Sequence, residues 1–311
     1  MKIVFMGTPA AAVPTLECIA ADGHEVVAVY TQPDRPSGRG NKVVFSPVKA
    51  KALELGIPVL QPEKVRTVEA LTTFRSHAAD VAVVVAYGRI LPLHFLNAYP
   101  KGAVNVHFSL LPKLRGAAPV NWAIANGDRK SGVTTMRMDE GLDTGDILLQ
   151  RETPIEAGET AVELLSRLSF VGAELLAETL ENIETLTPRP QEHELATLAP
   201  ILKRSDGEID WNLTSAKISN RVRGFQPFPA SFTSFRGERL TIWAAEPTLE
   251  PSSADPGEIV ETTKDVIFVS CGKQTTLAIT ELQQQGRKRL TTRDLLNGVH
   301  IEKGERFSQI Q

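Results

Sequence analysis

The chain has 311 residues, 42% of them hydrophobic and 23% charged, and a formal net charge of −3. This composition is typical of a soluble globular protein long enough for two domains; it excludes a disordered chain and gives no argument for a nucleic acid partner. No apolar run approaches the roughly 20 residues that cross a bilayer, no signal peptide is recognisable, and the two cysteines, Cys18 and Cys271, lie far apart, so we expect no membrane association and a reducing, cytoplasmic location.

The first half of the chain alternates strand-like and helix-like segments. Strands are expected at 2–6, 25–30, 80–86, 103–108, 132–138 and 147–149, and helices from about 10 to 21 and at 119–125. The continuous valine-rich runs indicate strands that are buried on both faces, as in a parallel sheet covered by helices. The alternation therefore predicts an α/β domain with a Rossmann-like, doubly wound, mostly parallel sheet.

The pattern of predicted elements changes after one long amphipathic segment at 160–183. A proline-marked polar stretch follows, and we place a linker at 189–204. Beyond it, one short helix at 215–223 precedes short β-prone pieces, which are typical of a small barrel or sandwich. We expect an N-terminal domain over 1–188 and a C-terminal domain over 205–311 that forms a small, OB-like β-barrel.

Asn105 and His107 stand two residues apart at the end of a predicted strand, so their side chains point to the same side. An amide donor and an imidazole in that arrangement suit an oxyanion site, and Asp143, in a Gly-Leu-Asp-Thr-Gly turn, adds a carboxylate. No Ser or Cys nucleophile stands beside them, which favours direct attack of one substrate on the carbonyl of another. Taken alone, a structural strand-end histidine and an ordinary turn aspartate explain the same residues.

The glycine signature of a dinucleotide-binding turn is absent. The first strand ends in Gly7-Thr-Pro9 without a G-x-G-x-x-G sequence, so we expect no nicotinamide cofactor. Three segments are instead locally basic: residues 34–51 carry five Lys or Arg against one Asp, residues 217–239 carry five against one Glu, and Arg287, Lys288 and Arg289 are consecutive. They form either a track for a polyanion or ordinary solvated surface.

Several stretches, in the same order along almost the whole chain, resemble the folate-dependent formyltransferases. They are residues 5–9, 31–40, 86–92, 105–119, 138–146 and 282–304. The resemblance implies transfer of the formyl group of 10-formyltetrahydrofolate, a cosubstrate that is consumed, to the α-amine of methionine esterified to initiator tRNA. No metal is implied.

The resemblance also assigns roles. Asn105 and His107 would stabilise the oxyanion, and Asp143, near His107, would act as a base or as an orienting group. The folate would lie on a binding loop and in a pterin pocket, although ordinary core packing also accounts for Leu110, Leu111 and Ile90. The loop residues are Ser109, Leu110, Leu111 and Pro112, and the pocket residues are Tyr87, Gly88, Ile90 and Leu91.

The basic, glycine-containing loop at 34–51 would contact the tRNA acceptor end, with Arg39 first, then Arg35 and Lys42. Further phosphate contacts would come from Lys217, Arg221, Arg287, Lys288 and Arg289 in the C-terminal domain. Two alternatives stay open: a formyltransferase acting on a small amine, either glycinamide ribonucleotide or an amino sugar nucleotide, and a non-catalytic RNA-binding protein. Nothing requires more than a monomer.

Overall fold

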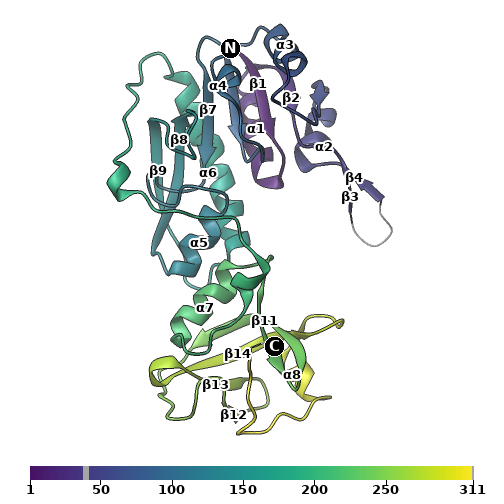
Figure 1. The fold of residues 1–311 in the computed structure, drawn as a ribbon, viewed down its shortest axis with the longest axis vertical. Coiled ribbons are helices and arrows are strands. Elements are labelled where there is room, and N and C mark those ends of the chain that lie inside the picture. Colours follow the sequence, from purple (N-terminus) through teal and green to yellow (C-terminus); the bar gives the residue numbers. More distant parts are fainter. Residues whose placement is uncertain (38–41, 310–311) are drawn as a thin grey trace. The chain divides into compact units, whose positions relative to one another are not determined.

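A seven-stranded sheet forms the centre of the N-terminal part of the chain (Figure 1). Its strand order is β5-β2-β1-β6-β7-β8-β9. The bounds are β1 Lys2–Gly7, β2 Glu25–Tyr30, β5 Val59–Leu60, β6 Val81–Val85, β7 Ala103–His107, β8 Lys130–Arg137 and β9 Ile147–Pro154. The pairs β1·β2, β1·β6, β2·β5 and β6·β7 are parallel, and β7·β8 is antiparallel. The predicted Rossmann-like, mostly parallel sheet is confirmed.

The computed structural model describes residues 1–37 and 42–309, and it divides into two units. The N-terminal unit consists of Met1–Pro119, Ser131–Pro154 and Leu165–Ala199; the C-terminal unit consists of Val120–Lys130, Ile155–Leu164 and Pro200–Gln311. The division after Ala199 falls inside the linker predicted at 189–204, and the predicted domain limits stay predictions. No helix in the described ranges is long and apolar enough to cross a membrane.

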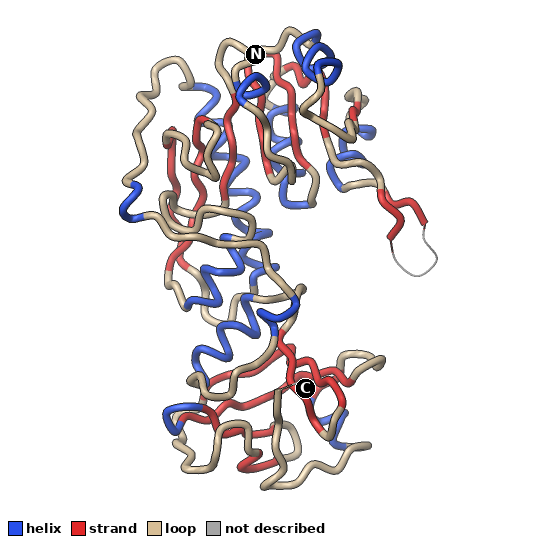
Figure 2. The backbone as a smooth tube through the Cα atoms, in the orientation of Figure 1, coloured by secondary structure: helices blue, strands red, loops and turns tan. Residues whose placement is uncertain are grey.

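Helices cover both faces of the N-terminal sheet (Figure 2). Their bounds are α1 Val13–Ala21, α2 Pro47–Glu54, α3 Val68–Ser76, α4 Leu93–Leu96 and α6 Ala161–Glu181, which belongs to this unit from Leu165 on, with a 3-10 turn η1 at Ala10–Ala12. Helix α5, Pro119–Asn126, belongs from Val120 on to the C-terminal unit. Phe74 of α3 and Phe95 of α4 share one core cluster with Ala103 of β7. An added Cβ at Gly172 of α6 would lie 3.0 Å from Val106, so α6 packs on the opposite face of β7.

Local capping signals explain helices that the hydrophobic pattern did not reveal. Ser46 accepts a hydrogen bond from the backbone N–H of Lys49 at 3.0 Å, and Pro47 occupies the first turn of α2. Thr67 caps α3 in the same way, through the N–H of Ala70 at 3.2 Å. These caps fix the start of α2 after strand β4 (Lys42–Val44) and the start of α3 after β5, where the hydrophobic pattern alone predicts no helix.

The C-terminal unit is built on an antiparallel sheet with the order β10-β11-β14-β13-β12, and β15 pairs with β14. The bounds are α7 Ser215–Gly224, β10 Ser231–Phe235, β11 Glu238–Pro247, β12 Ile259–Thr262, β13 Ile267–Cys271, β14 Thr275–Gln284, β15 Leu290–Thr291 and α8 Thr292–Leu296, with 3-10 turns η3 Arg204–Gly207 and η4 Gly272–Gln274. The 3-10 turn η2, His193–Leu195, belongs to the N-terminal unit. Ile218 and Val222 of α7 pack in one buried cluster with Ile242 of β11 and Ile279 of β14. The predicted small antiparallel β domain is confirmed, and its closure into an OB-like barrel stays a prediction.

Candidate active site

Asn105 and His107 lie at the carboxyl end of β7 and are nearly buried, with 8% and 6% of their surface exposed. Strand alternation places both side chains on the face of Ala103, away from α6. The Asn105 amide has no hydrogen-bond partner anywhere in the described part of the chain, yet it is not sealed from solvent. A nearly buried amide with unused hydrogen-bonding capacity is available to a ligand.

The two ring nitrogens of His107 have different surroundings. Nε2 lies 3.0 Å from the carbonyl oxygen of Leu114 and donates its proton there. Nδ1 lies 3.7 Å from Oδ2 of Asp143, which is too long for a direct hydrogen bond but within ion-pair distance. Nδ1 is therefore the ring nitrogen left to exchange a proton at this site.

Asp143 is held by a hydrogen bond from the loop after β7 and by hydrogen bonds within its own loop. It has a backbone φ of +53°, and its Oδ2 accepts a hydrogen bond from the backbone N–H of Gly116 at 2.8 Å. The loop around it is tied by Asp139, whose Oδ1 accepts from Gly141 N at 3.1 Å and from Thr144 Oγ1 at 2.7 Å. The structure thus brings His107 and Asp143 together, while their catalytic roles stay a prediction.

The predicted folate loop at 109–112 is rigidly hydrogen-bonded to the sheet. Thr134 Oγ1 of β8 donates to Ser109 O at 2.7 Å and accepts from Leu111 N at 3.1 Å, and Gln150 donates to Leu111 O at 2.8 Å. Leu111 packs in a buried cluster with Met136 and Ile147. Leu110 and Pro112 are only half-buried, so the loop offers them and its backbone to a ligand.

The residues of the predicted pterin pocket separate into two groups. Tyr87 and Leu91 are core residues, 2% and 4% exposed, and burial raises the pKa of the Tyr87 hydroxyl. Gly88 and Ile90 are exposed, Ile90 by 71%. The exposure of Ile90 contradicts the alternative of ordinary core packing for that residue, and the assignment of all four residues to a pterin pocket stays a prediction.

Ile90 borders a basic depression of about 480 Å³ that the sequence analysis missed. It is lined by Lys64, Val65, Arg66, Thr67, Arg89 and Ile90. Arg89 is held by Gln32 Oε1 at 3.1 Å and by Glu63 O. The side chains of Lys64 and Arg66 are exposed and find no partner in the residues that the structure describes. Arg89 lies within the 86–92 motif, and it is the residue from which the sequence could have predicted this depression.

The predicted tRNA-contacting loop at 34–51 contains a short hairpin that projects from the N-terminal unit, and its last residues lie in helix α2 (Figure 1). Arg35 lies in β3 (Arg35–Ser37) and Lys42 in β4 (Lys42–Val44), while Arg39 lies outside the described residues. Lys49, at the base of the hairpin, pairs with Asp34, donates to Gln61 Oε1 at 2.8 Å and lies 4.0 Å from the centre of the Phe45 ring. The hydrogen bonds from Lys49 and Gln61 hold the pKa of Asp34 below its usual range.

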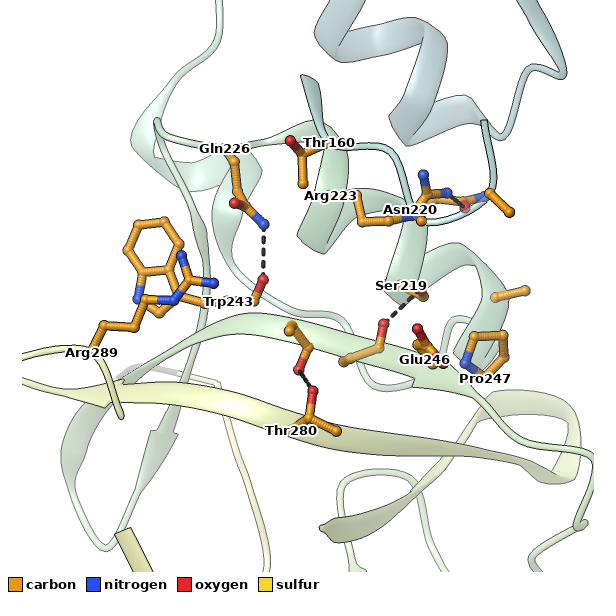
Figure 3. A pocket seen from close by; sticks show the side chains of 15 residues that line it. Thr160, Ser219, Asn220, Arg223, Gln226, Trp243, Glu246, Pro247, Thr280 and Arg289 are labelled. Atoms are coloured by element: carbon orange, nitrogen blue, oxygen red, sulfur yellow. Dashed lines mark hydrogen bonds between the residues drawn. The ribbon is translucent and has the colours of Figure 1, made fainter. Parts of the chain in front are cut away.

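The five predicted phosphate contacts of the C-terminal domain also differ in availability. Lys217, Arg287 and Lys288 are exposed, without a side-chain partner among residues 1–37 and 42–309. Arg221 donates to Asp206 O at 3.0 Å. Arg289 pairs with Glu281 and lies over the Trp243 ring at 5.2 Å, and it lines a cavity of about 500 Å³ together with Arg223 and Glu246 (Figure 3).

Comparison with known proteins covers both units. Residues 1–180 match the family model described as formyl transferase, and residues 201–300 match the formyl transferase C-terminal domain. The methionyl-tRNA formyltransferase of Solibacter usitatus is 48% identical over 99% of this chain and 99% of its own, and that of Bacillus subtilis is 44% identical over 98% and 96%.

Solved structures with the same fold include those of WlaRD and HypX. WlaRD, a sugar 3N-formyl transferase, covers 93% of this chain and 99% of its own with a TM-score of 0.67 and 20% identity. HypX from Aquifex aeolicus, in complex with tetrahydrofolic acid, covers 99% of this chain and 50% of its own, with a TM-score of 0.65 and 19% identity. Such low identities show the fold alone. The sequence matches decide the family, and they confirm the resemblance: the chain belongs to the methionyl-tRNA formyltransferase family.

Proposed function

We propose that this protein transfers the formyl group of 10-formyltetrahydrofolate to the α-amine of methionyl-initiator tRNA. One geometric observation carries the chemistry: an unpartnered, nearly buried amide, Asn105, stands two residues from His107, whose Nδ1 faces Asp143 at 3.7 Å. The substrates follow from relatives named for this activity, which match over 98–99% of the chain. The proposed location is the cytoplasm and the proposed state a monomer.

The reaction needs one stabilised oxygen and one relocated proton. The amine nitrogen bonds to the formyl carbon, the carbonyl oxygen becomes an oxyanion, and the bond from carbon to the folate nitrogen then breaks. The Asn105 N–H donates to the oxyanion. The proton that leaves the amine is needed on the departing nitrogen, and His107 Nδ1 and Asp143 Oδ2 are the groups that hold it in between.

The folate fits the features beside this trio. The half-buried Leu110 and Pro112 and the loop backbone suit a flat heterocycle, and Gly88 and Ile90 are open to it. The cations of Lys64 and Arg66 suit the carboxylates of the folate glutamate, because both are exposed and neither has a partner in the described chain.

Arg66→Gln is expected to raise KM for 10-formyltetrahydrofolate about 2- to 5-fold without changing kcat, because one exposed ion pair contributes up to about 1 kcal/mol. Steady-state kinetics with the folate as varied substrate measure this. Arg75→Gln is the matched control, since Arg75 is an exposed cation on α3 outside the depression. An unchanged KM in Arg66→Gln places the carboxylates elsewhere.

Arg39→Ala is expected to lower kcat/KM for charged tRNA and to leave the folate KM unchanged. A lost phosphate contact also reduces the slope of log(kcat/KM) against log[salt] by about one. A salt series with charged tRNA measures both effects. The same specificity constant and slope as the wild type would move the contact away from Arg39.

The decisive test of the function compares acceptors with 10-formyltetrahydrofolate as donor. Charged initiator tRNA, free methionine, glycinamide ribonucleotide and an amino sugar nucleotide are offered at equal concentration. We expect turnover on the charged tRNA alone, falling steeply with salt. Comparable turnover of a small amine would establish the alternative formyltransferase, and no turnover of any acceptor would favour the non-catalytic protein.

A further inference from the structure

The segment Arg189–Ala199, called the strap below, is bonded to both loops of the candidate active site. At its start, Arg189 and Ile147 exchange two backbone hydrogen bonds of 2.9 Å. At its end, Arg115 N donates to Thr197 O at 2.8 Å, and Ala199 N donates to Arg115 O at 2.7 Å. The strap therefore lies against the loop after β7 and against the start of β9, which follows the Asp143 loop.

Gln191 is the strap residue that reaches the Asp143 loop. Its side chain is buried, with 5% of its surface exposed, and its Nε2 donates to two backbone carbonyls, Asp143 O at 2.9 Å and Gly145 O at 2.7 Å. One amide group thus holds the backbone on both sides of Thr144. The Asp143 carboxylate projects from this held backbone toward His107.

Arg115 fixes the orientation of that amide. Arg115 is 6% exposed, and its Nε and Nη2 donate to Gln191 Oε1 at 3.0 and 2.6 Å. A guanidinium has donors only, so the amide oxygen of Gln191 must face Arg115 and the NH₂ group must face the loop. His193 Nδ1 lies 3.2 Å from both Nη atoms of Arg115 and accepts a hydrogen bond from the guanidinium.

We infer that Gln191, oriented by Arg115, is a positioning residue for formyl transfer: it sets where the Asp143 carboxylate stands relative to His107. The inference rests on the proposed function. Gln191 touches neither substrate in this scheme, and it acts through Asp143. A shift of about 1 Å at a reacting group is enough to cost about 100-fold in rate.

Gln191→Glu tests this role, and the two KM values together with the dependence on Asp143 distinguish it from a loss of folding. The carboxylate keeps the size of the side chain and pairs with Arg115, but it turns the donor toward Asp143 O and Gly145 O into an acceptor. We expect kcat on charged tRNA to fall about 10- to 100-fold with both KM values close to wild type, and the thermal midpoint to drop because two backbone carbonyls lose their donor. Glu192→Gln, the reverse exchange at the adjacent exposed position, is the matched control and should retain full kcat.

A double-mutant cycle with Asp143→Asn tests the route of the effect. If Gln191 acts through Asp143, adding Gln191→Glu to Asp143→Asn lowers kcat by less than about 2-fold further. Full activity of Gln191→Glu, or the same loss with and without Asp143, overturns the inference. Gln191→Met, neutral and of similar length, enters the same cycle if the glutamate variant does not fold. A wild-type protein that formylates no charged tRNA would instead refute the proposed function itself.

Discussion

Asn105→Ala should lower kcat for formyl transfer by about 100- to 1000-fold, the usual cost of one oxyanion donor. Its amide has no partner in the described part of the chain, so the truncation leaves no buried group unpaired. Stability and both KM values should therefore stay near wild type. Steady-state kinetics and thermal unfolding of the same preparation measure the two sides of this expectation.

His107→Ala should reduce kcat at least as much, but it should also destabilise the fold. The Nε2 proton of His107 is bonded to Leu114 O at 3.0 Å, and losing it leaves a buried carbonyl without its donor, at a cost of about 1–3 kcal/mol. Asn97→Ala, at an exposed asparagine of the same unit, serves as the control for both variants. Near-normal turnover in Asn105→Ala would remove the amide from the mechanism.

Gly116→Ala should damage activity and stability together. Gly116 has a φ of +123°, which costs an alanine about 1–3 kcal/mol, and its added Cβ would lie 2.6 Å from Ala199 O of the strap. The displaced backbone would also lose the 2.8 Å hydrogen bond from Gly116 N to Asp143 Oδ2. We expect kcat to fall about 100-fold or more and the thermal midpoint to drop.

A second glycine distinguishes backbone strain from the contact with the strap. Gly56 has a φ of +69° and nothing within 4 Å of its added Cβ. Gly56→Ala should therefore lose some stability while keeping full kcat. Equal kcat in Gly116→Ala and Gly56→Ala would show that the contact between Gly116 and the strap does not control the position of the Asp143 carboxylate.

The sequence predicted the strands of the sheet better than the helices, because a buried strand has a more distinctive local sequence pattern than a short helix. Valine-rich runs such as Val81–Val85 place every residue inside, and all five are buried. The short helix α4 has four residues and no side-chain cap, so its sequence gives no comparable signal. Helices α2 and α3 carried caps at Ser46 and Thr67 that a search for capping residues would have found.

The sequence also predicted part of the candidate site from a local pattern. Asn105 and His107 share one strand, so their spacing alone puts them on one face. Lys49 has the charge of a phosphate ligand, yet the fold uses it on Asp34 and Gln61. Which Lys and Arg side chains stay available to a ligand depends on neighbours that are distant in the sequence. Neither the composition nor a motif predicts those neighbours.

The sequence by itself determined the fold class, the family and the residue types at the end of β7, because these are written in local patterns and contiguous motifs. Only the tertiary structure decided that Gln191, in a segment with the composition of a linker, holds the backbone of Asp143. A buried hydrogen bond joins donor and acceptor through space, and its free energy depends on where folding leaves both groups. Nothing in the sequence around Gln191 or around Asp143 indicates that the two residues are hydrogen-bonded.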